Sequence, residues 1–318
     1  MNNWPGGGVD PTPLITIGIT CFNARNTIER AVAGAKAQKW DNFEILIVDD
    51  CSTDGAVEKI EALAVSDKRI HFFRHEMNRG YPAALNTIIQ NAAGKFVAFF
   101  DDDDESAPDR LEKQYERLVG YERKTGATSV FCYTDRAVVK AGEGRQGGAV
   151  HAIGRTEKPP HGEMVAKYLL WHYEPPSYSW GQFGSCTLLV RRAVLQDLEG
   201  FDEQFRRCAE WDLAIRAAFS GAHFIALDQT LVTQHITPTE DKAGRKPLKY
   251  ALMLREKHRN YLKRKHLYRA SCAMAYSRFH YSKRRRMKSR LFLALACLLA
   301  PHAVLPNELA KKLRNRHY

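Results

Sequence analysis

A run of five acidic residues directly follows an apolar stretch in the segment FVAFFDDDDESAPDRL, residues 96–111. Carboxylates this close repel one another, and the repulsion is relieved when a cation binds between them. Mg²⁺ and Mn²⁺ prefer oxygen ligands and are commonly held by one or two carboxylates together with the phosphates of a substrate. The run therefore indicates a divalent-cation site for a phosphorylated ligand. A solvated acidic loop that caps the next helix through Ser106 or Asp109 is the alternative.

A second candidate for chemistry is the segment CAEWDLAIRA at residues 208–217, which has helical spacing and carries Glu210 and Asp212 near its start. A carboxylate in a cleft can act as a general base that takes a proton from a reacting hydroxyl. Residues two positions apart on a helix point about 200° apart, so the two carboxylates cannot face the same cleft. Stabilisation of the helix dipole by the pair is the alternative role.

The acidic run must be positioned by the elements that precede it, which alternate between two patterns. Apolar runs rich in β-branched residues predict buried strands, and segments with helical spacing of apolar residues predict the helices between them. This alternation predicts an α/β fold with a mostly parallel sheet, whose ligands bind at the carboxyl ends of the strands. Polar residues occupy three of those ends, at 20–23, 49–50 and 101–104. The predicted strands are residues 14–20, 43–48, 70–74 and 95–100, and the predicted helices are residues 26–38, 52–64 and 81–93.

The second half of the chain has weaker patterns. Much of residues 141–185 is rich in Gly, Pro, His and aromatic residues and is expected to form loops. After about residue 245 the pattern is helical to the end of the chain. Between these regions and within them, the sequence predicts helices at residues 164–173, 191–198 and 208–220, and strands at residues 185–190, 223–227 and 231–235.

The charge of the chain is unevenly distributed. The net charge is +12, but residues 241–318 contain 22 Lys and Arg against 3 Asp and Glu, so the rest of the chain is slightly acidic. A basic region of this kind predicts an anionic partner, either a membrane surface or a nucleic acid. No RNA-binding signature accompanies it, which ranks nucleic acid well below a membrane.

The most apolar run in this basic region is LFLALACLLA at residues 291–300, preceded by KRRRMKSR at residues 283–290. The apolar run has about half of the roughly 20 residues that span a bilayer. Basic residues beside a short apolar helix predict an in-plane helix at the surface of an anionic membrane, at residues 283–305. A core helix with a solvated basic face is the alternative.

Cysteine content and N-terminal composition predict the compartment. The seven cysteines are scattered and form no CxxC pair, which argues against disulfides and structural zinc and favours a reducing cytoplasm. Residues 1–13 are polar and rich in Gly and Pro, so we expect a loose, flexible tail and no secretory signal. Together with the basic region, these features predict a cytoplasmic protein peripheral to the inner face of the cell membrane.

Four segments in order carry a family resemblance: ITCFNARNTIERAVAGAKAQKWDNFEILIVDDCSTDG, NRGYPAALN, AFFDDDDESAPDRLE and LEGFDEQFRRCAEWDLAIRA. Together they resemble the family 2 glycosyltransferases with the GT-A fold over about residues 14–236. The resemblance implies a Rossmann-like sheet flanked by helices, with a nucleotide-sugar half at 14–135, an acceptor half at 136–240 and a basic helical extension at 241–318.

The same resemblance implies an activity and a cofactor. The activity is metal-dependent, inverting transfer of a sugar from a nucleotide-sugar, usually UDP-linked, to a hydroxyl of an acceptor. The acceptor is a glycan or a lipid-linked glycan in envelope polysaccharide synthesis. The implied cofactor is a divalent cation, Mg²⁺ or Mn²⁺.

The resemblance also assigns roles to individual residues. The family pattern Asp-x-Asp-Asp, counted back from Pro108, falls on Asp101, Asp103 and Asp104, with Asp102 at the variable position. The implied nucleotide-sugar contacts are Thr20, Asn23, Asp50, Asn78, Arg79, Asn86, Asp101 and Asp102. The implied metal-site residues are Asp101, Asp103, Asp104 and His235, and the implied acceptor contacts are Gly184, Ser185 and Trp211.

The implied general base is Glu210, which stands where the family has an Asp, and Asp212 is the second candidate. Ala209 replaces the Glu that usually precedes the base. This departure leaves a non-catalytic GT-A domain as one alternative function. Binding of an anionic polymer or nucleic acid through the basic C-terminal region is the other.

Overall fold

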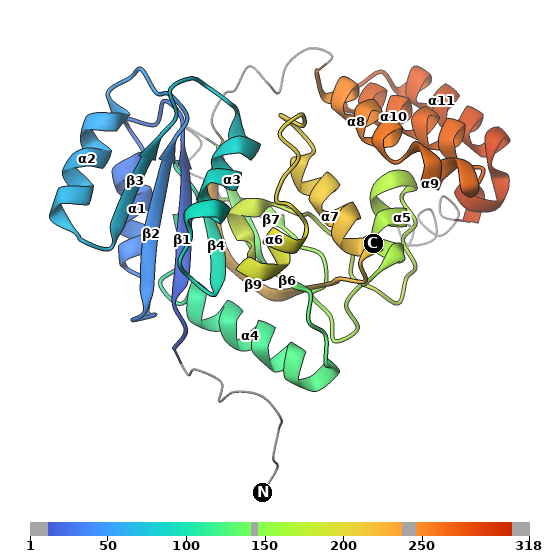
Figure 1. The fold of residues 1–318 in the computed structure, drawn as a ribbon. Helices are drawn as coiled ribbons and strands as arrows, with labels where there is room; N and C mark the ends of the chain where they lie inside the picture. Colours follow the sequence, from blue (N-terminus) through green and yellow to red (C-terminus); the bar gives the residue numbers. More distant parts are fainter. Residues whose placement is uncertain (1–11, 141–145, 237–245, 307–318) are drawn as a thin grey trace, which may run out of the picture.

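One mixed sheet runs through the computed structural model of the chain, which describes residues 12–140, 146–236 and 246–306 (Figure 1). In the described residues the sheet has nine strands in the order β3-β2-β1-β4-β8-β6-β9-β5, and β7 pairs with β6 outside this path. The strands are β1 (Ile15–Cys21), β2 (Phe43–Asp49), β3 (Ile70–Arg74), β4 (Phe96–Asp101), β5 (Glu105–Ser106), β6 (Val130–Lys140), β7 (Gln146–Val150), β8 (Leu189–Arg191) and β9 (His223–Ile236).

Helices surround this sheet and continue beyond it at the C-terminal side (Figure 1). They are α1 (Ile28–Lys36), α2 (Ala56–Ser66), α3 (Tyr81–Asn91), α4 (Arg110–Thr125), α5 (Glu163–Trp171), α6 (Arg192–Asp197), α7 (Ala209–Phe219), α8 (Lys246–Lys257), α9 (Arg259–Arg264), α10 (Tyr268–Ser282) and α11 (Arg286–Leu299). A short 3-10 turn, η1 (Ser185–Thr187), precedes β8.

The strands β1 to β4 pair in parallel, as their apolar sequences predict. β1 lies between β2 and β4, and Thr20 is in register with Val48 and Asp101. The polar residues that follow these three strands therefore meet at one edge of the sheet. Gly18 in β1 allows α3 to pack closely, because a Cβ at this position would lie 2.4 Å from Cγ2 of Ile88.

Helices cover both faces of the sheet. On one face, Ile28 of α1 and Leu111 of α4 share a core with Ile17 of β1. On the other face, Ile88 of α3 and Leu213 of α7 belong to a larger core that also includes α5. Both faces of the central strands are therefore buried, which explains their nearly continuous apolar sequences.

The second half of the sheet is mixed. β8 is antiparallel to β4 and β6, while β6 is parallel to β9. β5 pairs antiparallel with β9, with Glu105 and Ser106 opposite Thr233 and Val232. This pairing holds the loop of the acidic run against β9.

The predicted α/β fold is confirmed, with local differences. Residues 185–190 form η1 followed by β8 rather than one strand, because Thr187 donates hydrogen bonds from its N–H and its hydroxyl to the carbonyl of Gly184. The two predicted closing strands form the single strand β9, whose pairing with β6 is irregular near Asp135. β6 and β7 lie where the sequence predicts no strand, since charged and small residues interrupt their apolar pattern.

The C-terminal helices α8 to α11 pack on the side of α5 and α7 (Figure 1). Leu254, Met274 and Ala296 join the core that contains α5 and α7. Arg255 of α8 is 2% exposed and donates hydrogen bonds to the carbonyls of Leu170 in α5 and Ser271 in α10. The described part of the basic region is thus joined to the acceptor half by a common core.

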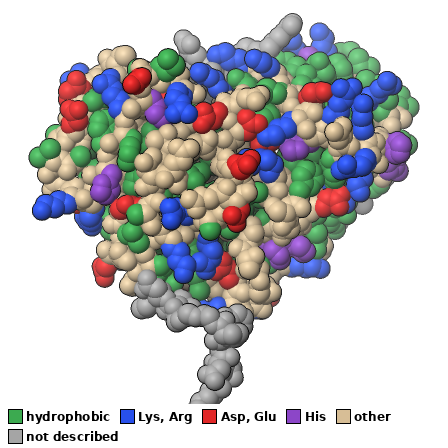
Figure 2. Space-filling view, viewed as in Figure 1, with side chains coloured by type: hydrophobic (Ala, Val, Ile, Leu, Met, Phe, Trp, Pro, Cys, Tyr) green, Lys and Arg blue, Asp and Glu red, His purple; other side chains and the backbone are tan. Residues whose placement is uncertain are grey.

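The outer face of α11 is apolar and exposed. Met287, Leu291 and Leu298 are 85, 68 and 81% exposed. Figure 2 shows hydrophobic side chains gathered at the upper right, over the C-terminal helices, with Lys and Arg beside them. Ser289 and Ala296 are the buried residues of this helix. α11 therefore packs along a narrow stripe and leaves most of its apolar surface uncovered.

Three further sequence predictions concern the cysteines, membrane-spanning segments and the N-terminus. All seven cysteines are free thiols in the structure. Within the described ranges, no helix has the length and apolar character needed to cross a membrane. Most of the predicted N-terminal tail, residues 1–11, lies outside the described residues.

Candidate active site

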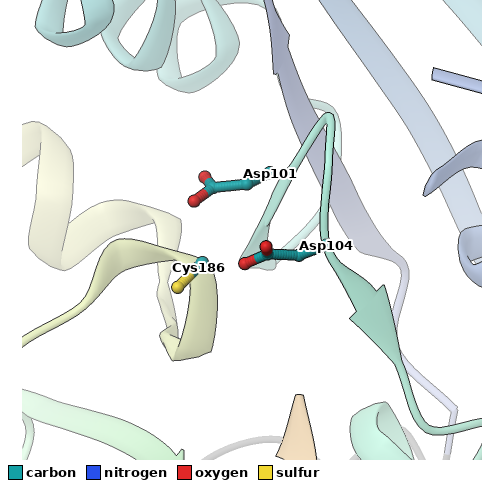
Figure 3. A group of neighbouring side chains, drawn as sticks. All are labelled: Asp101, Asp104 and Cys186. Carbon is teal, nitrogen blue, oxygen red and sulfur yellow. The ribbon is translucent and has the colours of Figure 1, made fainter. Parts of the chain in front are cut away.

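The acidic run at the end of β4 brings two carboxylates next to a thiol. Oxygen atoms of Asp101 and Asp104 and Sγ of Cys186 in η1 all lie within 4.8 Å of one another (Figure 3). Asp104 is 5% exposed, and its Oδ1 accepts a hydrogen bond from the N–H of His235 at 3.1 Å. Its Oδ2 is buried and has no hydrogen-bond partner among the described residues. A buried carboxylate oxygen without a donor is a position where a cation would complete the contacts.

The electrostatics of this group favour a cation. Burial, together with the charges of Asp101 and Asp103, raises the pKa of Asp104 to about 8. Burial and the charge of Asp103 raise the pKa of Asp101 to about 6. Burial also holds the pKa of the Cys186 thiol well above its usual range, so this sulfur is a neutral, weak ligand. Two carboxylates with a buried, unpaired oxygen fit Mg²⁺ or Mn²⁺.

The two remaining aspartates of the run lie in other surroundings. The carboxylate of Asp102 accepts a hydrogen bond from the N–H of Phe22 at 3.0 Å and so holds the loop after β1. Burial raises the pKa of Asp102 to about 8. The backbone carbonyl of Asp103 accepts a hydrogen bond from Arg30, and its carboxylate is not one of the three clustered groups. Metal binding by Asp103 stays a prediction from the family pattern.

His235, the fourth predicted metal-site residue, faces the acidic run through its backbone. Its N–H bonds to Asp104, while Nε2 of its ring lies 2.8 Å from Oε1 of Glu105. The ring is therefore directed at Glu105 in this structure. Its role as a metal ligand stays a prediction.

Asp50 organises the loop that leads into α3. Its Oδ1 accepts hydrogen bonds from the N–H of Arg79 and from Nδ1 of His75, and its Oδ2 accepts one from the N–H of Gly80. The side chain of Asn78 donates to the carbonyl of Asp50 at 3.2 Å. Asp50 is 3% exposed and holds the loop before α3 through these bonds, and its contact with a nucleotide stays a prediction.

Thr20 and Asn23 lie at the end of β1, where the sheet register brings them to the same edge as Asp101. The side-chain carbonyl of Asn23 accepts a hydrogen bond from the N–H of Thr53. The backbone N–H of Asn23 donates a hydrogen bond to the hydroxyl of Ser52. These bonds join the loop after β1 to the loop after β2. Thr20, Asn23 and the loop after β2, which carry predicted nucleotide contacts, thus lie side by side at this edge of the sheet.

Asn86 of α3 bonds to the loop that precedes α7. Its side chain donates to the carbonyl of Phe201 and accepts from the N–H of the same residue, both at 2.8 Å. Gly200 has φ +66°, and a Cβ there would lie 2.4 Å from Oδ1 of Asn86. Asn86 and Arg79 both also bond to Glu203. Asn86 thus fastens the 200–203 loop to α3, and its contact with a nucleotide stays a prediction.

The candidate base lies in a cleft of about 830 Å³ that is also lined by Asp101. Glu210 is in the first turn of α7, and burial raises the pKa of its carboxyl group. The predicted acceptor residues Gly184, Ser185 and Trp211 line the same cleft. The structure therefore brings the donor-side carboxylate, the candidate base and the predicted acceptor residues to one space.

A chain of hydroxyl groups connects the two carboxylates of this cleft. Oγ of Ser185 lies 3.2 Å from Oε1 of Glu210, and the hydroxyl of Tyr81 lies 3.1 Å from Oδ1 of Asp101. The two hydroxyl oxygens are 2.7 Å apart. Asp101 and Glu210 are thus joined through three short contacts.

Asp212, the second candidate base, is placed elsewhere. It is fully buried, is not among the cleft-lining residues, and accepts hydrogen bonds from Arg216, Lys257 and His258. Burial opposes its ionisation, but these three donors outweigh burial and lower the pKa of Asp212 to about 2. Such a carboxylate is a poor proton acceptor, so the structure supports Glu210 and gives Asp212 a role in anchoring α8 to α7.

Sequence reasoning missed Tyr81, Cys186 and Arg136. Arg136 of β6 lines the cleft, and its charge favours the ionised forms of Asp101, Asp104 and Glu210. It follows Asp135 in a strand that the sequence does not predict, so no local signal marks it. For Tyr81 the sequence offers one signal, its position directly after Gly80 at the start of the predicted helix 81–93.

The relationship to known proteins follows from a match to one family. The model described as glycosyl transferase family 2 matches residues 16–177. The chain belongs to glycosyltransferase family 2. The predicted resemblance is therefore confirmed, and the acidic run and the predicted nucleotide contacts lie inside the matched region.

Curated relatives of this family 2 chain include proteins of envelope polysaccharide synthesis. It is 26% identical over 256 residues to the amylovoran biosynthesis glycosyltransferase AmsB of Erwinia amylovora, a match that covers 79% of each chain. It is 33% identical over 106 residues to the UDP-Glc:alpha-D-GlcNAc-diphosphoundecaprenol beta-1,3-glucosyltransferase WfgD of Escherichia coli, covering 33% of this chain and 41% of WfgD. The matches to six other curated relatives cover 16 to 44% of their length.

Solved structures confirm the fold. S. aureus TarS in complex with UDP-GlcNAc aligns with a TM-score of 0.64 at 18% identity, over 91% of this chain and 82% of TarS. The mannosyltransferase PcManGT of Pyrobaculum calidifontis, in complex with GDP-Man and Mn²⁺, aligns with a TM-score of 0.57 at 18% identity, over 97% of this chain and 82% of PcManGT. The family 2 chain thus has the GT-A architecture with a C-terminal helical region.

Proposed function

We infer that this chain is a metal-dependent, inverting glycosyltransferase. It transfers a sugar from a nucleotide-sugar, UDP-linked, to a hydroxyl of a lipid-linked glycan during synthesis of an envelope polysaccharide. The observation that carries this proposal is that Asp101 and Glu210 line one cleft, with Asp104 beside Asp101. A donor diphosphate and an acceptor hydroxyl can therefore meet between a cation site and a base.

Asp101 and Asp104 are the residues that would hold the divalent cation. When bound, the cation supplies Lewis-acid stabilisation of the diphosphate leaving group. The loops after β1, β2 and β4 lie beside these carboxylates at the sheet edge, where α/β folds bind nucleotides. Mn²⁺ and GDP-Man are bound by PcManGT, and UDP-GlcNAc is bound by TarS, which supports a nucleotide-sugar donor here.

Glu210 is the proposed general base. It accepts the proton of the acceptor hydroxyl while the acceptor oxygen bonds to the anomeric carbon. The bond between that carbon and the diphosphate oxygen breaks, and its electron pair leaves with the nucleotide diphosphate. A single displacement of this kind inverts the anomeric configuration. The raised pKa of Glu210 brings its proton affinity closer to neutral pH, as a general base requires.

The substitution of Ala209 for the usual family Glu leaves this base in place. Ala209 is 1% exposed and packs in the core, whereas Glu210 reaches the cleft. The carboxylate needed for proton transfer is therefore retained. This favours an active enzyme over a non-catalytic domain.

The C-terminal helices provide the proposed membrane contact. The exposed apolar face of α11 carries Met287, Leu291 and Leu298, and the neighbouring residues 283–290 are basic. Apolar side chains can enter the acyl boundary while the basic residues pair with anionic headgroups. We propose peripheral binding to an anionic membrane, which would bring the enzyme to a lipid-linked acceptor. The name of WfgD, which includes diphosphoundecaprenol, supports an acceptor of this class.

A panel of nucleotide-sugars tests this proposal. The full chain is incubated with each donor and Mn²⁺ or Mg²⁺, and release of the nucleotide diphosphate is measured. We expect metal-dependent release from a UDP-sugar that Asp104→Asn abolishes and that Asp109→Asn, a carboxylate outside the group, leaves unchanged. Metal-independent release, or none from any nucleotide-sugar together with no binding of UDP and Mn²⁺, would contradict the proposal.

A further inference from the structure

The cleft that contains Glu210 has a second part that the transfer reaction does not use. Beyond the carboxylates, its walls are formed by the loop before α7 and by the helices α8 and α10. Arginines line one stretch of it, and apolar side chains from α8 and α10 line another. The chemistry of these two stretches matches a ligand with an anionic group next to an apolar chain.

The charged stretch consists of Arg206, Arg207 and Arg278. Arg206 and Arg207 precede α7, and Arg278 is an exposed residue of α10. In the described part of the cleft wall, Asp101 and Glu210 are the carboxylates, so the arginines outnumber them. Guanidinium groups bind phosphate oxygens in bidentate geometry, which makes a phosphate the fitting anion.

These arginines are spread along the wall of the cleft. Arg206 lies beside Gly80 at the start of α3, since a Cβ at Gly80 would lie 3.6 Å from Nε of Arg206. Arg207 acts on Glu210, and Arg278 acts on Tyr168 and on the buried Arg255 of α8. Arg207 is three residues before Glu210, and Arg278 is on α10, the helix that also carries Phe279 and Tyr281 of the cleft wall.

The apolar stretch consists of Leu248 and Ala251 of α8 and Phe279 and Tyr281 of α10. Tyr281 is 65% exposed and lies one residue before the C-terminal end of α10. The basic segment 283–290 and the exposed apolar face of α11 follow directly in the chain. The apolar stretch thus lies next to the surface that we propose binds the membrane.

We propose that this part of the cleft binds the diphosphate and the first isoprenoid units of a polyisoprenyl diphosphate-linked acceptor. Arg206, Arg207 and Arg278 hold the diphosphate, and the apolar wall of α8 and α10 holds the lipid next to it. The acceptor sugar then lies between the diphosphate and Glu210. Because Arg207 is three residues before Glu210 and both line the cleft, the sugar next to the diphosphate is the one placed at the base. The chain therefore acts early, on a carrier that bears one or a few sugars.

This inference rests on the proposed function and is tested with short prenyl probes. The full chain is first saturated with UDP and Mn²⁺, so that the donor side is filled, and binding of farnesyl diphosphate, farnesol and inorganic pyrophosphate is measured by calorimetry. We expect farnesyl diphosphate to bind at least tenfold more tightly than either other probe, because it alone satisfies both stretches.

Two variants separate the stretches. Arg206→Gln with Arg278→Gln should weaken farnesyl diphosphate binding about tenfold or more and leave farnesol unchanged, since each lost charge-assisted bond is a large part of the phosphate interaction. Phe279→Ser should weaken both farnesyl probes and leave pyrophosphate unchanged. Arg123→Gln, an exposed arginine of α4, is the matched control. Binding of UDP with Mn²⁺ reports that each variant is folded.

Four results would overturn the inference. The first is unchanged farnesyl diphosphate binding in the arginine variant, and the second is one-for-one release of the bound UDP by farnesyl diphosphate. The others are equal displacement of farnesyl diphosphate by a single-stranded oligonucleotide and self-association that blocks the farnesyl probes. If UDP with Mn²⁺ binds the wild type but farnesyl diphosphate does not, this inference alone fails. If UDP with Mn²⁺ does not bind at all, the proposed function fails.

Discussion

The hydroxyl oxygens of Tyr81 and Ser185 lie 2.7 Å apart and join the donor side of the cleft to the acceptor side. Tyr81 also contacts Asp101, and Ser185 also contacts Glu210. Two hydroxyl hydrogens serve these three oxygen–oxygen contacts, so the chain is complete only when one of the two carboxyl groups carries a proton. The protonation of Glu210, the proposed base, is thus connected to the protonation of Asp101, a proposed cation ligand.

Tyr81→Phe removes the centre of this chain. The Tyr81 hydroxyl favours the ionised form of Asp101, so its loss should raise the pKa of Asp101 and weaken Mn²⁺ binding at pH 7. We expect about a tenfold loss, the size of one hydrogen bond to a charged group. Calorimetry with Mn²⁺ and UDP measures it, and raising the pH should restore part of the affinity. Tyr121→Phe, whose hydroxyl bonds to His223, is the control. An unchanged affinity with an unchanged pH dependence would show that the chain is not coupled to the cation site.

Glu210→Gln should separate binding from transfer. The amide keeps a similar shape and an acceptor oxygen for Ser185 but cannot take a proton, so transfer should fall by about 10²–10⁴-fold. Binding of UDP with Mn²⁺ should remain within a few-fold of the wild type. Steady-state rates together with calorimetry provide both readings. Transfer at the wild-type rate would mean that another group is the base.

Asp212→Asn should act on stability instead. It leaves Lys257 and Arg216 without the buried carboxylate that both contact. Breaking a buried ion pair on one side costs about 3–5 kcal/mol, and the exposed ends of these cations place this case near the lower value. Denaturant unfolding measures the change. If the variant keeps wild-type stability but loses transfer, Asp212 is the base and our assignment of Glu210 is wrong.

The stability of the metal-free protein should depend on pH through Asp104. An unfolded Asp titrates near 3.9, whereas burial raises the pKa of Asp104 to about 8. Between these values the folded state binds a proton that the unfolded state lacks, so stability falls as the pH rises from about 4 to 8. Asp104→Asn should flatten this slope. It should also increase the free energy of unfolding at pH 8 by about 1–3 kcal/mol, because its amide carries no buried charge.

Thermal unfolding with EDTA at pH 6 and pH 8 measures this slope. Adding Mn²⁺ at pH 8 should raise the Tm of the wild type and leave that of Asp104→Asn nearly unchanged. Equal slopes for the two proteins, or equal responses to Mn²⁺, would remove Asp104 from the cation site.

Leu291→Glu combined with Leu298→Glu should abolish membrane binding. Each leucine contributes about 1.5–3 kcal/mol when it leaves water, so the pair accounts for about a hundredfold or more in vesicle affinity. Sedimentation with vesicles rich in phosphatidylglycerol measures the bound fraction. Val65→Glu on α2, at a side chain that is 89% exposed, is the matched control. Undiminished vesicle binding of the double variant would exclude α11 as the contact.

The sequence predicts the N-terminal half of the fold well because each element there is encoded locally. The apolar runs that become β1 to β4 are buried on both faces, and their spacing from the helices leaves few topologies. β6 is different, because the strand that it pairs with is far away in the sequence. Its pairing with β9 joins residues about a hundred positions apart, and no local pattern announces such a strand.

The sequence predicts those parts of the site that depend on the residue types of one short segment. The end of β4 indicates a cation site by composition, but the turn after it decides that Asp104 rather than Asp103 clusters with Asp101. Cys186 and Ser185 reach the site through η1, which forms where a strand is predicted. The bonds between Asn86 and Phe201 could not be predicted, because these residues are far apart in the sequence and meet only on folding.

The contact of Asp212 with Lys257 and His258 has a geometric consequence for the whole molecule. It locks the helix that carries Glu210 to the helices that we propose rest on a lipid surface. The height of the reacting carboxylate above that surface is then a fixed dimension of the protein rather than a property of a linker. Under this proposal, only an acceptor hydroxyl at the matching distance from the bilayer can reach Glu210.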